Sequence, residues 1–477
     1  MSEALWRPDE LAEATGARLL GAVGAANGVS IDTRTLQPDD LFCAVQGDAR
    51  DGHGFVRDAL AKGAAAAVVA ESRAGEFADA GPLAAVPDVL GALQSLGRAA
   101  RRRSSARLVA VTGSVGKTGT KEALRLCLGR LGETHASVAS YNNHWGVPLT
   151  LARMPRSAAF GVFEVGMNHA GEIAPLTALV RPHVAVVTTV EPVHIEHFRS
   201  VSAIADAKGE IFGGLEPGGV AVLPRDNPHY ERLRAHALAS PAGRVLGFGE
   251  HAEADVRAER IVLKADLSYV EARVLGRPVS FRLGSPGRHV ALNALSVLAA
   301  VHALGGDLAR AAAALADLKP PVGRGERTVL QAPGGSFTLV DESYNANPAS
   351  MRAALANLAA VEPGEGGRRL AVLGDMLELG SDGPALHRGL AEAVEASGAD
   401  LVFLVGPLMR HLLDALPQGR RGGHADDAAG LEAAVLDAVR PGDVLTVKGS
   451  NGIRVSRIVA ALKNRYGARA DRAAAKA

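Results

Sequence analysis

The sequence predicts an α/β protein of three domains built on parallel sheets, and three observations support this fold class. Apolar, β-branched runs typical of strands alternate with segments of helical periodicity, which is the pattern of βαβ units. A chain of 477 residues has room for roughly three domains at about 150 residues each. Two changes in composition also divide the chain. The clearest strand-like runs are residues 108–111, 160–165, 184–190, 337–340, 370–373, 401–405 and 444–447.

The first division follows a short basic run at residues 101–105, Arg-Arg-Arg-Ser-Ser. Charge runs of this length are usually solvated, so we expect a helix end and a linker here rather than a nucleic-acid patch. The first domain is therefore predicted to span residues 1–104.

The second division lies at residues 317–326, where two prolines and two glycines follow an alanine-rich helical segment. Pro and Gly interrupt regular structure, so this stretch predicts a hinge. The central domain is expected at residues 105–318 and the third at 319–477, with a frayed tail from Asn464.

Composition excludes several classes of protein. Hydrophobic residues make up 47% of the chain and its net charge is +1, so we expect no nucleic-acid partner. The two cysteines, Cys43 and Cys127, lie in apolar stretches and are expected in the core. The N-terminus lacks the apolar region of a signal peptide, and no apolar run reaches membrane-spanning length. We therefore expect a cytoplasmic protein without membrane insertion.

Residues 109–120, Val-Ala-Val-Thr-Gly-Ser-Val-Gly-Lys-Thr-Gly-Thr, join a strand to a glycine-rich turn. The helical spacing of the next apolar residues puts that turn at a helix N-terminus. Free backbone N–H groups and the helix dipole favour an anion there, and glycines let phosphates approach closely. We predict a nucleotide phosphate site in which Thr118 would reach Mg²⁺, and in which Lys117 is exposed when nucleotide is absent. Its members are Gly113, Ser114, Gly116, Lys117 and Thr118.

This match is to a short Gly-x-x-Gly-Lys-Thr form, since Val111 stands where the common motif has a glycine. Such a hexapeptide can arise by chance, and the alternative is a plain glycine turn between a strand and a helix. The strand before it and the helix after it favour the nucleotide site.

Metal-ligating residue types gather in the middle domain. Glu164 is expected at the end of one strand, His194 follows the next, and Lys208 with Glu210 is predicted to open a helix. Ligands bind beyond the carboxyl ends of strands in an open parallel sheet, so Glu164 and His194 would flank the nucleotide crevice. There they could hold a Mg²⁺ that bridges ATP phosphates and an acceptor. Taken alone, a histidine is more often a surface or core residue, and no His/Cys spacing indicates structural zinc.

Four further segments carry a resemblance to a known family. They are residues 141–148 (Tyr-Asn-Asn-His-Trp-Gly-Val-Pro), 164–173 (Glu-Val-Gly-Met-Asn-His-Ala-Gly-Glu-Ile), 207–212 (Ala-Lys-Gly-Glu-Ile-Phe) and 341–351 (Asp-Glu-Ser-Tyr-Asn-Ala-Asn-Pro-Ala-Ser-Met). The chain resembles the Mur ligase superfamily over about residues 30–459. Residues 374–380 and 447–454 agree with the D-alanyl-D-alanine-adding subgroup, and the 341–351 segment is the most specific part.

The resemblance implies an ATP-dependent, ADP-forming amide ligase. It would join D-alanyl-D-alanine to UDP-N-acetylmuramoyl-tripeptide through an acyl phosphate, giving the UDP-muramoyl-pentapeptide precursor of peptidoglycan. The implied domains are a UDP-substrate domain, a P-loop ATPase domain with a mononucleotide-binding sheet, and a Rossmann-like domain that binds the amine and closes on ATP. The expected oligomeric state is a monomer.

The resemblance also assigns nucleotide and metal residues. Lys117 and Thr118 would hold the ATP phosphates and Mg²⁺, with Glu164 and His194 as further metal ligands. Lys208 matches a lysine that CO₂ converts to a carbamate, an anionic oxygen ligand suited to Mg²⁺ where an ammonium would repel it. The other implied nucleotide contacts are Asn293 for adenine, Arg324 and Asp341 for phosphate and ribose, and Tyr344 in the cleft.

Substrate contacts are implied in two regions. In the first domain, Ser30, Thr33 and Arg34 offer the hydroxyls and the guanidinium that uracil and a diphosphate need. The implied contacts near the cleft are Asn142, Asn143, Asn345 and Asn347.

Two segments depart from the family pattern, and rival functions stay open. His144 and Trp145 replace an acidic and an aliphatic residue, and residues 195–199, Ile-Glu-His-Phe-Arg, replace a small glycine-containing stretch. The 341–351 segment alone could be a loop capped by Asn and Pro. The alternatives are a meso-diaminopimelate or glutamate ligase, a folylpolyglutamate synthetase, or an ATP-driven switch that forms no bond. The third domain lacks the Asp-Asn-Pro-Arg element typical of the diaminopimelate-adding relatives.

Overall fold

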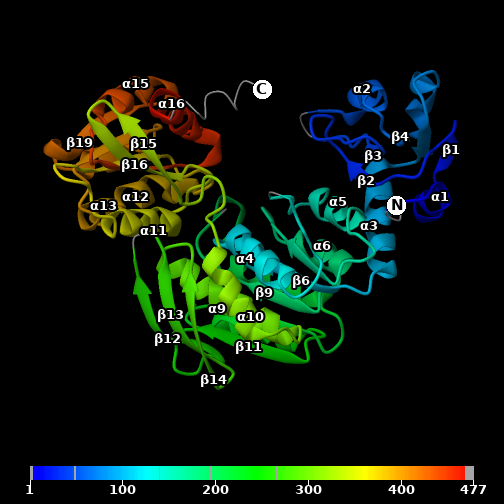
Figure 1. Cartoon of the computed structure of the whole chain (residues 1–477), viewed down its shortest axis with the longest axis horizontal. Coiled ribbons are helices and arrows are strands. Elements are labelled where there is room, and N and C mark those ends of the chain that lie inside the picture. The colour runs from blue at the N-terminus through cyan, green and yellow to red at the C-terminus, as the bar shows by residue number, and fades with distance from the viewer. Residues whose placement is uncertain (1–3, 48–49, 139, 194, 265, 468–477) are drawn as a thin grey trace.

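The computed structural model describes residues 4–47, 50–138, 140–193, 195–264 and 266–467. Within these ranges the strands form three separate sheets of five, nine and six strands, each covered by helices (Figure 1). In Figure 1 the central sheet lies at the bottom, and the N-terminal and C-terminal units lie above it on opposite sides. This confirms the predicted three-part α/β class. The boundaries at residues 104 and 318 stay predictions.

The first sheet is made of short strands around a small apolar core. Its strand order is β1-β5-β4-β3-β2, and all neighbours are parallel except β1 and β5. The strands are Arg18–Leu20 (β1), Gly28–Ser30 (β2), Asp40–Cys43 (β3), Ala66–Ala70 (β4) and Leu83–Val86 (β5), with helices Pro8–Thr15 (α1) and Val56–Ala61 (α2). Cys43 is fully buried in this core, as expected.

Helix α3 (Val89–Arg103) joins the first sheet to the central unit, where it packs against α5 (Gly146–Ala152). The prediction of a solvated helix end is wrong for Arg101, which is buried. Its guanidinium donates to the carbonyl of Val180 at 2.8 Å and to the carboxylate of Glu216 at 2.8 Å. A buried cation needs such partners because its desolvation is costly, so this basic run fastens the two units together.

The central sheet has the order β14-β13-β12-β11-β10-β9-β6-β8-β7. It is parallel from β7 to β12, as predicted, but β12, β13 and β14 form antiparallel hairpins. Along β13 the buried and exposed residues alternate strictly, which is typical of a sheet with one face in water. The strands are Arg107–Thr112 (β6), Thr134–Ala136 (β7), Phe160–Glu164 (β8), Val184–Val187 (β9), Val220–Pro224 (β10), Arg244–Gly249 (β11), Val256–Leu263 (β12), Ser268–Val274 (β13) and Arg277–Leu283 (β14).

Helices cover both faces of this sheet. One apolar core includes α4 (Lys117–Gly129), α9 (Arg288–Ala303) and α10 (Leu308–Ala314), and Cys127 is buried within it, as expected. The opposite core includes α6 (Ile173–Val180), α7 (Val201–Gly209) and α8 (Tyr230–Leu238). The expectation that Lys208 and Glu210 open a helix is wrong for Lys208, whereas Glu210 does open a short 3-10 helix, Glu210–Gly214. Lys208 lies in the last turn of α7, which begins earlier because Ser200 caps it by accepting the N–H of Ala203.

The third sheet has the order β15-β16-β20-β17-β18-β19 and is parallel apart from the β15–β16 hairpin. Its strands are Glu326–Ala332 (β15), Gly335–Glu342 (β16), Arg369–Gly374 (β17), Leu401–Val405 (β18), Arg421–Ala425 (β19) and Val444–Lys448 (β20). Helices α11 (Pro348–Ala359), α13 (Ala391–Ala396) and α14 (Arg410–Ala415) pack on one face, and α15 (Ala428–Ala438) and α16 (Ser456–Tyr466) on the other.

Two expectations about the ends of this unit can be compared with the structure. Residues 318–325, inside the predicted hinge, form neither helix nor strand. The expected fraying from Asn464 is wrong for the first residues, because α16 continues to Tyr466, whose hydroxyl donates to the carbonyl of Leu436. Residues 468–477 lie outside the described residues. Within the described ranges, every helix falls short of the length or the hydropathy that a membrane span requires.

Candidate active site

A cavity of about 730 Å³ lies where the carboxyl ends of the central and third sheets face one another. Its walls come from the segments that follow β6, β8, β9 and β10 and from the ends of β16 and β20. Of the predicted site residues, the cavity brings together Ser114, Gly116, Lys117, Thr118, Asn142, Glu164, Asn293, Arg324, Tyr344, Asn345 and Asn347. The predicted residues outside its lining are Gly113, Asn143, Lys208, Asp341, Ser30, Thr33 and Arg34. His194 lies outside the described residues.

The glycine-rich turn has the shape of an anion cradle. Gly113 and Gly116 have φ of +147° and +89°, which L side chains rarely adopt. A Cβ at Gly116 would collide with the side-chain amide of Asn293, so the loop and α9 touch directly. Lys117 begins α4, and its ammonium donates to the carbonyl of Gly113 at 2.7 Å. The expected exposure of Lys117 is therefore wrong, since the side chain is half-buried against its own loop.

Glu164, at the end of β8, is fixed beside this loop. Its side chain is buried, and one carboxylate oxygen accepts the hydroxyl of Thr118 at 2.9 Å. The other oxygen accepts the side-chain amide of Asn142 at 2.8 Å. Burial lowers the pKa of Lys117, and the nearby Glu164 carboxylate opposes that shift. A hydroxyl, a carboxylate and an ammonium thus meet at one corner of the cavity.

Lys208 is buried at the end of α7, with 2% of the residue exposed. Its ammonium makes no hydrogen bond or ion pair with any described residue. Burial lowers the pKa of Lys208 well below its usual value, and the charge of Lys117 lowers it further. An unpaired buried ammonium is costly, so this environment favours the neutral amine.

Without carbamylation of Lys208, these residues supply only part of the ligand set that a hard metal ion needs. Across the described residues, no three His, Cys, Asp or Glu side chains form a ready metal cluster. Thr118 and Glu164 supply two of the oxygen donors that Mg²⁺ prefers, already in contact with one another. Lys208 could add an anionic oxygen only as its carbamate.

The third unit forms the opposite wall of the cavity. Tyr344 crosses the gap, and its hydroxyl donates to the hydroxyl of Ser140 at 2.8 Å. The guanidinium of Arg324 stacks 4.1 Å from the centre of the Tyr344 ring. The side chain of Asn347 caps α11 by accepting the N–H of Ser350, so it shapes the loop. Asp341 turns away, and its carboxylate accepts the N–H and the hydroxyl of Ser343.

The sequence analysis missed several residues that line this cavity. Glu342, next to Asp341, faces it, and Lys448 approaches Glu342 at 3.4 Å while donating to the carbonyl of Asn345 at 3.0 Å. Glu191 lines the nucleotide side, where burial raises the pKa of its carboxyl. Alternation along β16 could have shown that Asp341 and Glu342 point to opposite faces. Nothing local indicated that β20 would bring Lys448 beside them.

Three family models match this chain, and they divide it into the same three parts as the sheets. The sequence model of the Mur ligase middle domain matches residues 111–301, the Mur ligase glutamate ligase domain matches 323–451, and the Mur ligase family catalytic domain matches 26–101. The UDP-N-acetylmuramoyl-tripeptide–D-alanyl-D-alanine ligase of Escherichia coli is 34% identical, with 95% of this chain and 97% of that protein aligned. The chain belongs to the Mur ligase family. This confirms the resemblance drawn from the motifs.

Solved structures of the family agree with this assignment. MurF from Acinetobacter baumannii is 28% identical, with a TM-score of 0.84 over 96% of this chain and 99% of that one. MurF from Thermotoga maritima, solved in complex with ADP, is 26% identical, with a TM-score of 0.74 over 92% of this chain and 97% of that one. The similarity therefore covers all three units of this Mur ligase.

In this Mur ligase the residues predicted to hold UDP lie on the first sheet, outside the cavity lining. Ser30 is buried at the end of β2. The exposed guanidinium of Arg34 pairs with Asp32 at 2.6 Å, and its hydrogen bonds lower the pKa of Asp32 to about 2. Thr33 lies between them, and its carbonyl accepts the ammonium of Lys62. These residues are grouped on one loop, and their substrate role stays a prediction.

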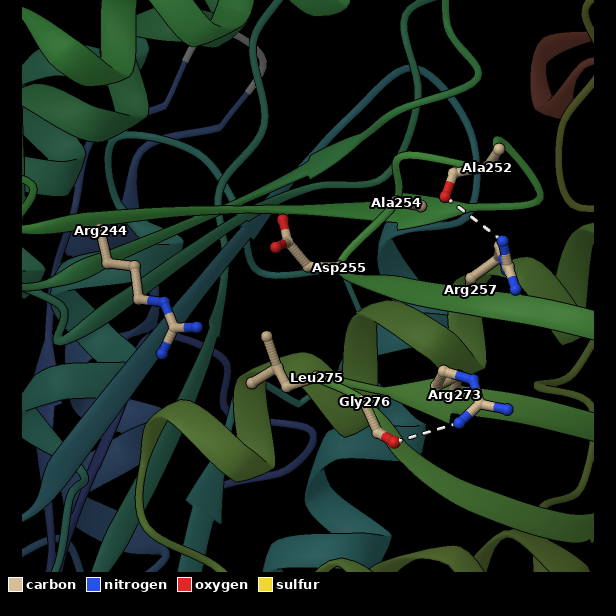
Figure 2. A pocket seen from close by; sticks show the side chains of 8 residues that line it. All are labelled: Arg244, Ala252, Ala254, Asp255, Arg257, Arg273, Leu275 and Gly276. Atoms are coloured by element: carbon tan, nitrogen blue, oxygen red, sulfur yellow. Dashed lines mark hydrogen bonds between the residues drawn. The ribbon is translucent and has the colours of Figure 1, made fainter.

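A second, more open hollow of about 420 Å³ lies beside β11, β12 and β13 (Figure 2). It is lined by Arg244, Asp255, Arg257 and Arg273. Arg257 donates to the carbonyl of Ala252 and Arg273 to that of Gly276, which the dashed lines in Figure 2 mark. None of the predicted site residues of the Mur ligase lies there, so the cavity between the sheets is the candidate active site.

Proposed function

We propose that this Mur ligase joins D-alanyl-D-alanine to UDP-N-acetylmuramoyl-tripeptide, using ATP and forming ADP and phosphate. One observation carries the proposal: the glycine-rich cradle and the 341–351 segment face each other across one cavity. The choice of substrates is supported by the names of relatives that align with this chain over nearly the whole length of both proteins. We further propose that the protein acts as a cytoplasmic monomer.

The proposed reaction starts from the carboxylate of the muramoyl-tripeptide, which is a poor electrophile. Transfer of the γ-phosphoryl group of ATP to it gives an acyl phosphate and ADP, a step that depends on positioning and charge neutralisation. The cradle of residues 113–118 would hold the phosphates on its N–H groups. Lys117 would then exchange the carbonyl of Gly113 for a phosphate oxygen, placing its charge where the transferred group is negative.

The second step forms the amide bond. The neutral amine of D-alanyl-D-alanine attacks the acyl carbon, and the tetrahedral oxyanion collapses to expel phosphate, with loss of one proton from nitrogen. For this step the third-unit wall supplies Lys448 and Glu342, a charged pair in which Glu342 belongs to the 341–351 segment. Closing of that wall around the residue 317–326 hinge would exclude water from the acyl phosphate.

Thr118 and Glu164 would hold Mg²⁺ at their corner of the cavity, with His194 and a carbamate on Lys208 as the further proposed ligands. When bound, it would neutralise charge between the triphosphate and the carboxylate. The proposed carbamate has a physical basis, because only a neutral amine can attack CO₂. The lowered pKa of Lys208 makes the neutral amine available at a lower pH than on an exposed lysine, and the attack releases one proton.

An amine panel tests the function directly. Purified protein is given ATP, Mg²⁺ and UDP-N-acetylmuramoyl-tripeptide with D-alanyl-D-alanine, meso-diaminopimelate, glutamate or D-alanine, and phosphate release and product mass are measured. We expect the dipeptide to give rapid turnover and a product heavier by one dipeptide less water. Faster turnover with a free amino acid and none with the dipeptide would show that the subgroup is wrong.

A further inference from the structure

Lys121 is a buried charge that the proposed mechanism does not use. It lies on α4, one turn beyond Lys117, and only 1% of the residue is exposed. Burial of an ammonium is costly unless strong partners surround it. Its nitrogen donates to the carbonyl of Ser137 at 2.8 Å and pairs with the carboxylate of Glu122 at 2.8 Å. The contact with Ser137 joins this buried charge to the segment that follows β7.

Ser137 is in direct contact with Glu164. The Ser137 hydroxyl oxygen accepts the backbone N–H of Glu164 at 3.3 Å, and Ser137 itself is buried. Five residues further along the same segment, Asn142 donates its side-chain amide to the Glu164 carboxylate, and its carbonyl accepts the N–H of Gly166 at 2.8 Å. The segment after β7 therefore holds Glu164 by its backbone and by its side chain.

These contacts close a ring on α4. Thr118 on α4 donates to the Glu164 carboxylate, Glu164 donates its N–H to the hydroxyl of Ser137, and the carbonyl of Ser137 accepts from Lys121, three residues further along α4. Residues three apart on a helix lie on the same side, so one turn of α4 supplies both ends of the ring. The ring therefore holds Glu164 at two points, its carboxylate through Thr118 and its backbone N–H through Ser137, which Lys121 in turn holds.

We infer that Lys121 is a positioning residue that fixes Ser137 and, through it, Glu164 at the nucleotide site. The inference rests on the proposed function, because it takes Glu164 to be a Mg²⁺ ligand. The segment after β7 also carries Ser140, the partner of Tyr344, so Lys121 lies close to one of the contacts between the third unit and the central one.

Three variants test this role. Lys121→Met keeps the length and apolar stem of the side chain but removes the ammonium, and Lys121→Arg keeps a cation. Arg101→Met is the matched control, since Arg101 is a buried cation that also binds a carbonyl and a carboxylate, away from the cavity. Hydrogen exchange of peptides covering residues 137–143 is measured for each, together with ADP affinity as a function of Mg²⁺ concentration.

We expect Lys121→Met to speed exchange in residues 137–143 and to raise the Mg²⁺ concentration for half-maximal ADP binding by about 10–100-fold, the usual loss when a group supporting a metal ligand is removed. Lys121→Arg should recover part of this loss, and Arg101→Met should change neither measurement. Both readouts are independent of ligation. A failure of the amine panel would therefore refute the proposed function without affecting this test.

A folded Lys121→Met protein with wild-type exchange and a wild-type Mg²⁺ requirement would overturn the inference. An equal shift in Arg101→Met would do the same, because the effect would then be a general loss of stability. If Lys121→Met does not fold, Ser137→Ala decides, since it removes only the acceptor of the Glu164 N–H. We expect a smaller shift in the same direction, and no shift would refute the connection through Ser137.

Discussion

The two walls of the cavity are held in different ways. On the central wall, Glu164 is 1% exposed and both its oxygens accept hydrogen bonds from fixed neighbours. On the third-unit wall, Tyr344 is 39% exposed and reaches across to Ser140 by a single hydroxyl. The difference indicates that the corner proposed to hold phosphate and metal is already formed without substrates. The amine-side wall is instead completed by a few contacts that can break and re-form.

The largest loss of activity is expected from the central wall. Lys117→Ala removes the cation proposed to lie beside the ATP phosphates, which should cost about 3–4 kcal/mol of transition-state stabilisation, roughly 10²–10³ in kcat, by analogy with a lost oxyanion donor. Circular dichroism and thermal melting should show an intact fold, because the side chain is only half-buried. Near wild-type kcat in a folded variant would overturn the P-loop assignment.

Lys208→Ala should be nearly inactive, because it removes the proposed carbamate. Acetate or formate should restore part of the activity by placing a small carboxylate in the vacated space, and chloride at equal ionic strength should not. Mass spectrometry of the wild type should find added CO₂ on Lys208 when bicarbonate is present. Burial lowers the pKa of Lys208, so its neutral amine is available at a lower pH than on exposed lysines, and modification should be lost on acidification. An active, unmodified enzyme would remove the carbamate from the mechanism.

A smaller, selective effect is expected from the first sheet. Arg34→Ala should raise KM for the UDP substrate with little change in kcat, since a hydrogen bond to a charged group contributes about 1.5–3 kcal/mol. Steady-state kinetics with the UDP substrate varied provide the measurement. Arg57→Ala is a suitable control, because Arg57 is another surface arginine paired with an aspartate, Asp79. Equal KM values for the two variants would place the UDP moiety elsewhere.

The smallest effect should come from the third-unit wall. Tyr344→Phe keeps the ring under Arg324 but removes the hydroxyl bonded to Ser140, which should cost about 0.5–1.5 kcal/mol of closure. We expect kcat to fall a few-fold, by about that free energy, while ADP affinity stays unchanged. Tyr269→Phe, at an exposed position on β13, is the control. A large loss of ADP affinity in Tyr344→Phe would contradict the separation of the two walls.

The sequence predicted the parts of the site that are local in the chain. The glycine turn, the strand before it and the helix after it occur within about twenty residues, and Glu164 lies at a strand end that apolar patterning could locate. The contacts that were missed join distant segments. Lys448 meets Asn345 only because β20 lies beside β16, and Lys121 meets Ser137 only because α4 packs near β7.

Errors in the predicted fold have the same origin. Arg101 was expected in water because a basic run is usually solvated, but α3 packs between two units and buries it. The antiparallel hairpins of β12, β13 and β14 were not distinguished from the parallel strands, because the direction of pairing is set by which strands meet in the sheet. The turn at Leu275 and Gly276, both with positive φ, joins only β13 to β14. Tertiary packing therefore decided what local patterns left open.

The coupling of ATP cleavage to amide formation tests the central claim most directly. ADP release and pentapeptide formation are measured in one reaction with UDP-N-acetylmuramoyl-tripeptide and D-alanyl-D-alanine, for the wild type and for Lys117→Ala. The account predicts one amide bond for each ADP released by the wild type, and a parallel loss of both products in the variant. ADP release without any amide bond, with both substrates present, would contradict it and indicate an ATP-driven switch.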